Sequence, residues 1–313
     1  MNKLKFYEYE NMEDFFYQHS SSSVVRAWGE DAEDYLQSQW TIDITKIKNG
    51  DIRFGLRLTS KGKILAGAYI TRIDDEEFLL ISEKIPASEI ITMMEENVVA
   101  DEIEFSDESE KWSFLSFHFL DTDILESKFN VSAPKANRFL KTDNGRLWID
   151  ARMQNGFYLS LIQKNAVSKM SPIEGLQCIT DERFETLRIK NENFSIPGEI
   201  GQEDLPQEAS MEDYAVDFNK GCYLGQEVMA RLHAMGKVQR QIMSIRWEGK
   251  NESPPPLPVG IMMDQKSVGS LRSLTKDKNT YLGVAKIHLK AKDQLFENGL
   301  DLEGPEMGRV FSL

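Results

Sequence analysis

Asp217-Phe218-Asn219-Lys220-Gly221-Cys222-Tyr223-Leu224-Gly225-Gln226-Glu227 is the stretch on which the interpretation of this chain depends. From Lys220 to Glu227 it combines a thiol, an amine, two glycines, an amide and a carboxylate. A helix is predicted directly afterwards, over residues 226–233, so Cys222 should lie near the positive end of a helix dipole. Lys220 adds a cation, and both features favour the thiolate, which is the reactive form of cysteine.

The same stretch also offers groups that can contact a ligand. Gly221 and Gly225 permit backbone conformations that expose amide N–H groups. Arg231 follows Glu227 by about one helical turn, so the two side chains can face one site or pair with each other. The alternative is that Cys222 is a small buried apolar side chain and the glycines only shape a turn. Residue types alone leave these two interpretations equally supported.

Composition limits the class of protein. With 313 residues, 41% of them hydrophobic, the chain can form two or three domains with cores of their own. A net charge of -14 argues against nonspecific binding to phosphate backbones. Two cysteines are too few for a disulfide framework, and neither Cys nor His occurs at metal-ligand spacing, so no metal site is predicted. The N-terminus lacks a signal-peptide core and no apolar run could span a bilayer, which together predict a cytoplasmic protein without a membrane partner.

Hydrophobic patterning predicts mixed strands and helices. Strands are expected at 52–58 and 64–70 around a hairpin turn, and at 259–263, 268–274 and 281–287 in a small β-barrel. Helices are expected after Pro86, over Ala133 to Leu140 and after the capping residue Thr180. This mixture indicates an α+β protein.

The segment Lys220 to Glu227 resembles the K-G-C-[YF]-x-G-Q-E signature of the YgfZ family, folate-binding relatives of the glycine-cleavage T-protein, an aminomethyltransferase. Ala230, Arg231, Gly236 and Arg240 extend the match. Gly29-Glu30-Asp31-Ala32 and Leu58-Thr59-Ser60-Lys61-Gly62-Lys63-Ile64 resemble two further segments of the family. The resemblance covers most of the chain and is weakest between about residues 100 and 175.

This resemblance implies a three-domain ring around a folate-sized channel, of the aminomethyltransferase folate-binding type. The folate-binding region would be split between residues 1–100 and 180–245. Residues 101–179 would form a ferredoxin-like α+β unit, and residues 246–313 a C-terminal β-barrel.

The resemblance also implies a function. The ligand would be tetrahydrofolate, and the role would be assembly or repair of iron–sulfur clusters in client enzymes, including enzymes that modify tRNA, without direct nucleic-acid contact. Cys222 and Lys220 would be the catalytic pair, and N-terminal aromatic residues would stack on the pterin. The folate-binding residues would be Gly221, Tyr223, Gly225, Gln226, Glu227, Arg231 and Arg240.

Departures from the T-protein argue against aminomethyl transfer. The T-protein has a pair of aspartates where this chain has Ala66 and Gly67, and neither residue can hold a cationic amine. Lys190 stands in place of its folate-contacting glutamate, and Glu192 in place of a usual glycine. An aminomethyltransferase and a noncatalytic scaffold remain the alternative functions.

Overall fold

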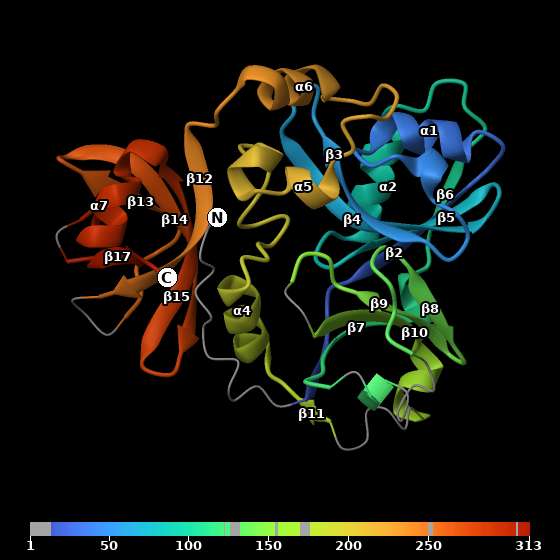
Figure 1. Cartoon of the computed structure of the whole chain (residues 1–313), viewed down its shortest axis with the longest axis horizontal. Helices are drawn as coiled ribbons and strands as arrows, with labels where there is room; N and C mark the ends of the chain where they lie inside the picture. The colour runs from blue at the N-terminus through green and yellow to red at the C-terminus, as the bar shows by residue number, and fades with distance from the viewer. Residues whose placement is uncertain are drawn as a thin grey trace.

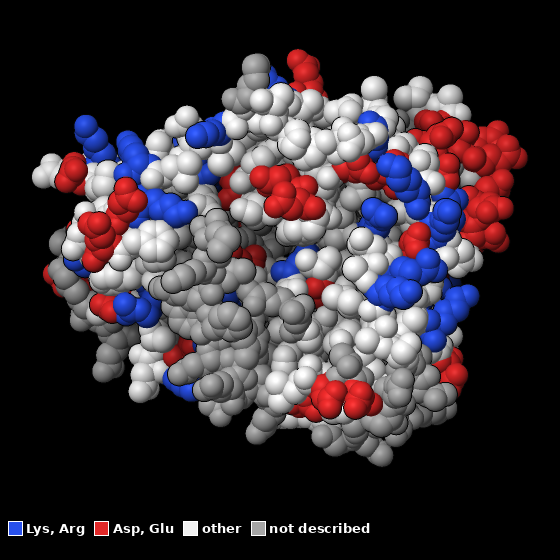
Figure 2. Space-filling view, in the orientation of Figure 1, with Lys and Arg blue, Asp and Glu red and all other residues white. Residues whose placement is uncertain are grey.

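Two β-sheets and a closed β-barrel form three lobes around the segment that carries α4 and α5 (Figure 1). The computed structural model describes residues 14–121, 123–125, 132–153, 156–169, 176–249, 253–304 and 306–313. Acidic side chains gather beside α1 and β6, so the negative charge is unevenly distributed over this face (Figure 2).

The first sheet has the order β3-β4-β5-β2-β6, and all of its neighbouring strands pair antiparallel. Its strands are β2 (Ser23–Trp28), β3 (Ile52–Leu58), β4 (Ile64–Asp74), β5 (Glu77–Ser82) and β6 (Glu104–Asp107). The first two helices are α1 (Ala32–Gln39) and α2 (Ala87–Glu95). The predicted hairpin of residues 52–70 is therefore confirmed, as is the helix after Pro86.

The second sheet has the order β11-β1-β7-β10-β9-β8. Its strands are β1 (Phe15–Gln18), β7 (Trp112–His118), β8 (Phe139–Thr142), β9 (Gly145–Ile149), β10 (Phe157–Gln163) and β11 (Gln177–Cys178). Thus β1 pairs with β7, about 100 residues later, and with β11, about 160 residues later, although it falls within the first predicted segment. The helix predicted over residues 133–140 is wrong, because residues 132–137 form coil and turn, Arg138 forms an isolated bridge with Asp51, and β8 follows.

Helices and loops connect these sheets to the barrel. They comprise α4 (Asp181–Lys190), the short 3-10 helix η5 (Pro206–Ala209), α5 (Glu212–Ala215) and α6 (Gln226–Met235). The side chain of Thr180 caps α4 by accepting a hydrogen bond from the Arg183 amide at 3.3 Å, as predicted.

The C-terminal barrel closes in the order β12-β15-β14-β13-β16-β17. It consists of β12 (Arg240–Glu248), β13 (Val259–Met263), β14 (Lys266–Asp277), β15 (Thr280–His288), β16 (Leu300–Leu302) and β17 (Arg309–Ser312), with α7 (Lys292–Glu297). It has a core of its own that includes Ile245, Leu271 and Val310. Its first strand begins at Arg240, inside the segment predicted for the folate-binding region.

A shared core joins the three lobes. It includes Phe54 and Tyr69 from the first sheet, Trp148 from the second sheet and Val284 from the barrel. The other face of the first sheet packs on a separate cluster with α1 and α2. Because successive residues of a strand face opposite sides, β4 contributes Tyr69 to the shared core and Ile70 to the helix-covered one.

Candidate functional site

Lys220 anchors the Cys222 loop to the end of α1. Its buried ammonium donates hydrogen bonds to the carbonyl oxygens of Gln37 at 2.6 Å, Ile42 at 2.8 Å and Trp40. Carbonyls at a helix C-terminus lack intrahelical partners and carry the negative end of the dipole, so a cation satisfies them well. An ammonium has three donors, and all three are used here.

The environment of Lys220 changes its predicted role. Burial lowers the pKa of Lys220 to about 8, against the attraction of Asp43 and Asp217, which raises it. The side chain remains an ammonium at neutral pH, yet its three bonds leave no donor for a hydrogen bond to the sulfur of Cys222. Lys220 therefore positions the loop that carries Cys222.

Backbone contacts hold the rest of the loop against the first sheet. The Leu224 amide donates to the Ser38 carbonyl at 3.1 Å, and the Asp217 amide donates to the Thr41 carbonyl at 2.9 Å. Gly225 has a φ of +85°, and a Cβ there would lie 2.6 Å from the Thr59 carbonyl oxygen. Only glycine fits this close approach. The Lys220–Glu227 stretch thus packs between the α1 segment and the hairpin around Gly62, the other two segments that resemble the family.

Cys222 is exposed, which excludes the interpretation that it is a buried apolar side chain. Gly221 beside it is also exposed, and a Cβ there would meet no atom within 4 Å. A fixed backbone therefore presents the thiol to solvent.

The residues predicted to bind folate differ widely in exposure. Tyr223 and Gly225 are buried, Gln226 is half-buried, and Gly221, Glu227, Arg231 and Arg240 are exposed. Among the described residues, no ion pair joins Glu227 to Arg231. Sequence reasoning missed the stacking of Phe218 on His233, whose ring centres lie 3.9 Å apart.

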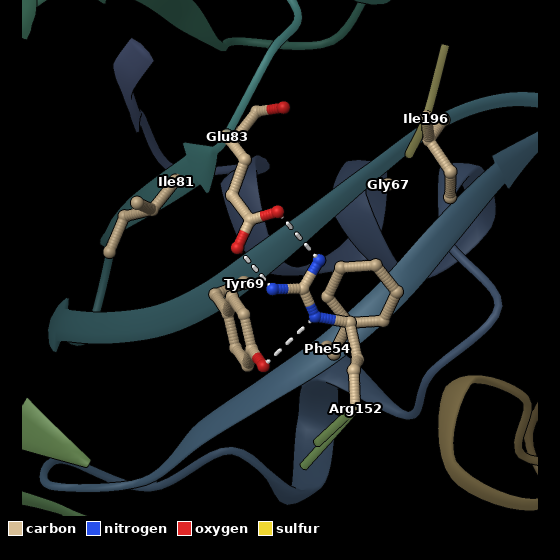
Figure 3. A pocket seen from close by; sticks show the side chains of 8 residues that line it. Phe54, Gly67, Tyr69, Ile81, Glu83, Arg152 and Ile196 are labelled. Atoms are coloured by element: carbon tan, nitrogen blue, oxygen red, sulfur yellow. Dashed lines mark hydrogen bonds and ion pairs between the residues drawn. The ribbon is translucent and has the colours of Figure 1, made fainter. Parts of the chain in front are cut away.

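A second candidate site, which sequence reasoning also missed, is a small pocket between the first sheet and the loop after β9 (Figure 3). Its volume of about 10 Å³ accommodates about one water molecule, far less than a pterin. No residue from Lys220 to Glu227 lines it. Its lining consists of Phe54, Gly67, Tyr69, Ile81, Ser82, Glu83, Arg152 and Ile196.

Arg152 fills the centre of this pocket. Its guanidinium donates to Glu83 through two nitrogens, one of them at 3.1 Å from Oε2, and its Nε lies 3.3 Å from the Tyr69 hydroxyl (Figure 3). Nε also lies 3.3 Å from Asp150 Oδ1. The guanidinium carbon also lies 4.9 Å from the centre of the Phe54 ring. Tyr69 in turn donates to Asp150 at 2.6 Å. The pocket is therefore a buried charged network with an aromatic wall.

Each charged group of this network shifts the pKa of its partners so that they stay ionised. Burial opposes ionisation of Glu83, but the Arg152 guanidinium outweighs it and lowers the pKa of Glu83 to about 2. Burial likewise opposes the charge of Arg152, whereas Asp150 and Glu83 raise its pKa well above the usual value. Nearby His19 is buried, and this burial lowers its pKa to about 4, so the ring is neutral at pH 7. It lies 2.7 Å from the Ser116 hydroxyl.

Gly67 lies in a closely packed part of this pocket, and Ser82 contributes a hydroxyl without a hydrogen-bond partner. A Cβ at Gly67 would lie 2.7 Å from the Phe54 ring and 3.0 Å from Ile196, so an aspartate there would collide with both. The neighbouring Ala66 faces the helix-covered core on the other side of β4. The buried Ser82 hydroxyl has no hydrogen-bond partner among the described residues.

The described residues include neither a metal-binding cluster nor a membrane-spanning helix. They contain no group of three or more His, Cys, Asp or Glu side chains placed to hold a metal ion. None of the described helices combines the length and apolarity that crossing a membrane requires.

The chain is similar to proteins of the glycine-cleavage T-protein and YgfZ type. Residues 16–118 match the GCVT N-terminal domain family. The chain is 26% identical over 313 residues to a tRNA-modifying protein YgfZ of Hamiltonella defensa, covering 92% of this chain and 86% of that protein. A stretch of 108 residues, 33% of this chain and 24% of the relative, is 31% identical to an iron-sulfur cluster assembly factor IBA57 homolog of Coccidioides immitis.

Among solved structures, the glycine cleavage system aminomethyltransferase T of Bartonella henselae superimposes with a TM-score of 0.76 at 12% identity. The superposition covers 96% of this chain and 85% of that chain. At this identity the likeness demonstrates a shared fold. The predicted α+β architecture of the aminomethyltransferase type, with a C-terminal barrel, is confirmed.

Proposed function

We propose that this chain, a YgfZ/GcvT-like protein, binds tetrahydrofolate and supports assembly or repair of iron–sulfur clusters in client enzymes, including tRNA-modifying ones. The observation that carries the proposal is the exposed Cys222 thiol on a loop whose neighbouring anchors are buried. Lys220, with three hydrogen bonds to the end of α1, holds that loop in place. A surface thiol that had no function would not need its loop to be held in one position.

Cys222 would act on a client protein rather than on folate. Thiolates are the usual protein ligands of iron–sulfur clusters, so an exposed one can contact an iron of the client's cluster or the client itself. The exposed guanidinium groups of Arg231 and Arg240 would meet acidic groups, either on the client or in the glutamate tail of the folate. The similarity to a YgfZ protein and to a cluster assembly factor supports this role.

Aminomethyl transfer receives no support from the geometry. A carboxylate at position 67 would overlap Phe54, and one at position 66 would lie in an apolar core. The charged groups beside these positions are already engaged, because Arg152 pairs with Glu83 and Asp150. A purified protein that releases a one-carbon unit from a folate substrate with turnover would reverse this conclusion.

The role of the thiol is tested by complementation of a strain that lacks this protein. Cys222→Ser should fail to restore the activity of iron–sulfur enzymes. Cys178→Ser is the matched control, because Cys178 is the other exposed thiol and lies in the second sheet. Full restoration by both variants would exclude a role for the thiol.

Folate binding is tested by calorimetric titration of the purified protein with tetrahydrofolate. Saturable heat at a stoichiometry of about one would support the proposal. No heat at millimolar ligand would favour a noncatalytic scaffold.

A further inference from the structure

A groove of about 690 Å³ lies at one end of the C-terminal barrel, where β12 ends and the chain turns from β14 into β15. Small-molecule sites usually have volumes of about 300 to 1,000 Å³, and the mouths of β-barrels are one of the places where they occur. No residue from Lys220 to Glu227 lines this groove, and it shares no residue with the pocket around Arg152. It is therefore a separate candidate site.

Two aromatic residues and a lysine form one row across three neighbouring strands at this end of the barrel. Tyr281 of β15 lies opposite Lys276 of β14 and opposite Trp247 of β12. Residues that lie opposite each other on neighbouring strands point to the same face of a sheet. The rings of Tyr281 and Trp247 meet edge to face, with their centres 5.3 Å apart. Trp247 is buried and Tyr281 is half-buried, so the Tyr281 ring is the aromatic surface that the groove offers to a ligand.

The charged residues that line the groove are mostly positive. Lys276 and Lys278 are exposed, and neither has an ion-pair partner among the described residues. Arg246 donates a hydrogen bond to Glu248 through one nitrogen, which uses one of the five N–H donors of a guanidinium. Three cations and one carboxylate give the lining a formal charge of +2, on a chain whose net charge is -14.

The acidic residue of the hairpin turn is held away from the groove. Asp277 lies between the two lysines in the sequence, but its carboxylate pairs with Lys190 of α4 at 2.6 Å and does not line the groove. The Thr186 hydroxyl of α4 also donates to the Lys276 carbonyl at 3.5 Å. The contacts with α4 (Figure 1) thus fix the hairpin in place and leave its lysines without a counter-charge.

We propose that this groove binds a nucleoside monophosphate, with its phosphate between Lys276 and Lys278 and its base against the Tyr281 ring. A phosphate monoester carries a charge of about -1.5 to -2 at neutral pH, which matches the charge of the lining. Lysine binds phosphate as a point charge, and a flat base stacks on an aromatic ring. The exposed Asn279 side chain adds an amide that both donates and accepts hydrogen bonds. This site does not depend on the proposed folate function.

The first experiment compares AMP with its two halves, adenosine and inorganic phosphate, in calorimetric titrations of the full chain. AMP should bind at least about 10-fold more tightly than either half, because a stacked base and a phosphate contact each contribute to the affinity. Phosphate that binds as tightly as AMP would reveal a simple anion site and overturn the base contact. Adenosine that binds as tightly, or no heat from AMP at millimolar concentration, would overturn the proposal.

Two pairs of lysines test the phosphate contact. Lys276→Gln/Lys278→Gln should weaken the binding of both AMP and phosphate at least about 10-fold, because two attractive charges are lost. Lys266→Gln/Lys290→Gln is the matched control, since it removes the same charge from exposed barrel lysines that lie outside the groove. The control should bind AMP like the unmodified protein. Equal losses in the two variants would indicate nonspecific attraction to a positive surface and would overturn the site.

Tyr281 tests the base contact. Tyr281→Leu should weaken the binding of AMP about 10-fold and leave that of phosphate unchanged, whereas Tyr281→Phe keeps the ring and should bind AMP normally. Unchanged AMP binding by Tyr281→Leu would contradict stacking on this ring. If Tyr281→Leu does not fold, the ratio of the AMP and phosphate affinities in the unmodified protein decides the same question.

A titration with AMP in the presence of saturating tetrahydrofolate separates this site from the proposed folate site. The affinity for AMP should not change, because the two ligands occupy different parts of the molecule. Loss of AMP binding would mean that the ligands share one site and would overturn this inference. Failure of tetrahydrofolate to bind at all would count against the proposed function alone.

Discussion

A partly buried and a buried arginine–glutamate pair in this molecule have the same chemistry, but their glutamates accept different numbers of hydrogen bonds. A cluster of charged residues around Glu199 and Asp204, here called the joint, connects the loop before η5 to the barrel. Glu199 accepts two hydrogen bonds from Arg188, at 2.6 and 2.9 Å, one from the Ser195 amide at 2.7 Å and one from the Ser273 hydroxyl. In the pocket, Glu83 accepts only the two from Arg152 among the described residues.

The rest of the joint is equally saturated. Asp204 binds Arg272 through both oxygens, at 2.7 and 2.9 Å, and also binds Lys286 and the Gly201 amide at 2.9 Å. These bonds connect the loop before η5 to β14 and β15. The carboxylates of this cluster have their acceptor positions filled, although Arg188 Nε has no hydrogen-bond partner among the described residues. A carboxylate with no acceptor position left offers nothing to a ligand, whereas Glu83 has acceptor positions left. The comparison thus separates a structural cluster from a candidate site.

The largest expected difference concerns removal of the two arginines. Arg188→Met should lower the free energy of unfolding by about 3 to 5 kcal/mol, because it leaves Glu199 buried without a counter-charge. Arg152→Met should cost less, about 1 to 3 kcal/mol, because the Glu83 side chain is 15% exposed and reached by water. Asp150 is buried and also loses this counter-charge, but it keeps hydrogen bonds from the Tyr69 hydroxyl and from the backbone amide at position 152. Urea denaturation of the two variants measures both values. Equal losses of unfolding free energy would mean that the Arg152–Glu83 pair contributes as much to stability as the Arg188–Glu199 pair.

The packing of the pocket gives the next largest effect. Gly67→Ala should cost about 1 to 3 kcal/mol, because the added Cβ forces Phe54 and Ile196 apart. Gly201→Ala is the control, because a Cβ there meets no atom within 4 Å and the change should stay within about 0.5 kcal/mol. Thermal unfolding of both variants tests the difference. An unchanged free energy of unfolding in Gly67→Ala would show that Phe54 has space to move.

Ser273 and Ser82 form a matched pair, because the first hydroxyl has a hydrogen-bond partner and the second has none among the described residues. Ser273→Ala should cost about 1.5 kcal/mol, because its hydroxyl donates to the charged Glu199. Ser82→Ala should change the free energy of unfolding by less than about 0.5 kcal/mol, because the hydroxyl has no partner to lose. The two values come from the same denaturation assay. A loss at Ser82 as large as that at Ser273 would reveal a partner for Ser82 and weaken the case for a ligand there.

The smallest effect is a dependence on pH. Burial raises the pKa of Glu83, but the positive charge of Arg152 lowers it by more, so the pKa falls from an ordinary 4.5 to about 2. The stabilisation it provides is present above the ordinary value and is lost as pH falls towards 2. In Arg152→Met the carboxyl group of Glu83 loses its counter-charge and is protonated more easily at acidic pH. The stability gap between this variant and the unmodified protein should therefore narrow by about 1 kcal/mol between pH 7 and pH 3. A constant gap would show that Glu83 does not depend on Arg152.

Local pattern was sufficient to predict much of the fold. The strand predicted at 52–58 matches β3, and those at 259–263, 268–274 and 281–287 lie in β13, β14 and β15. The reason is that strand alternation and turn residues act over a few neighbouring positions. The helix predicted over Ala133 to Leu140 is wrong. Its last two residues, Phe139 and Leu140, pair with β9 as part of β8, and the residues before them form coil, turn and an isolated bridge.

The candidate site depended on contacts that no local pattern contains. Residue types could not decide whether Cys222 is buried, and they placed Lys220 beside the thiol, whereas its ammonium binds a carbonyl 183 residues away. Glu83 and Arg152 lie 69 residues apart in the chain and were not singled out at all. The sequence by itself determined the elements and the family signature. Only the tertiary structure decided which charges are buried together, because the cost of removing a charge from water arises only when distant segments close around it.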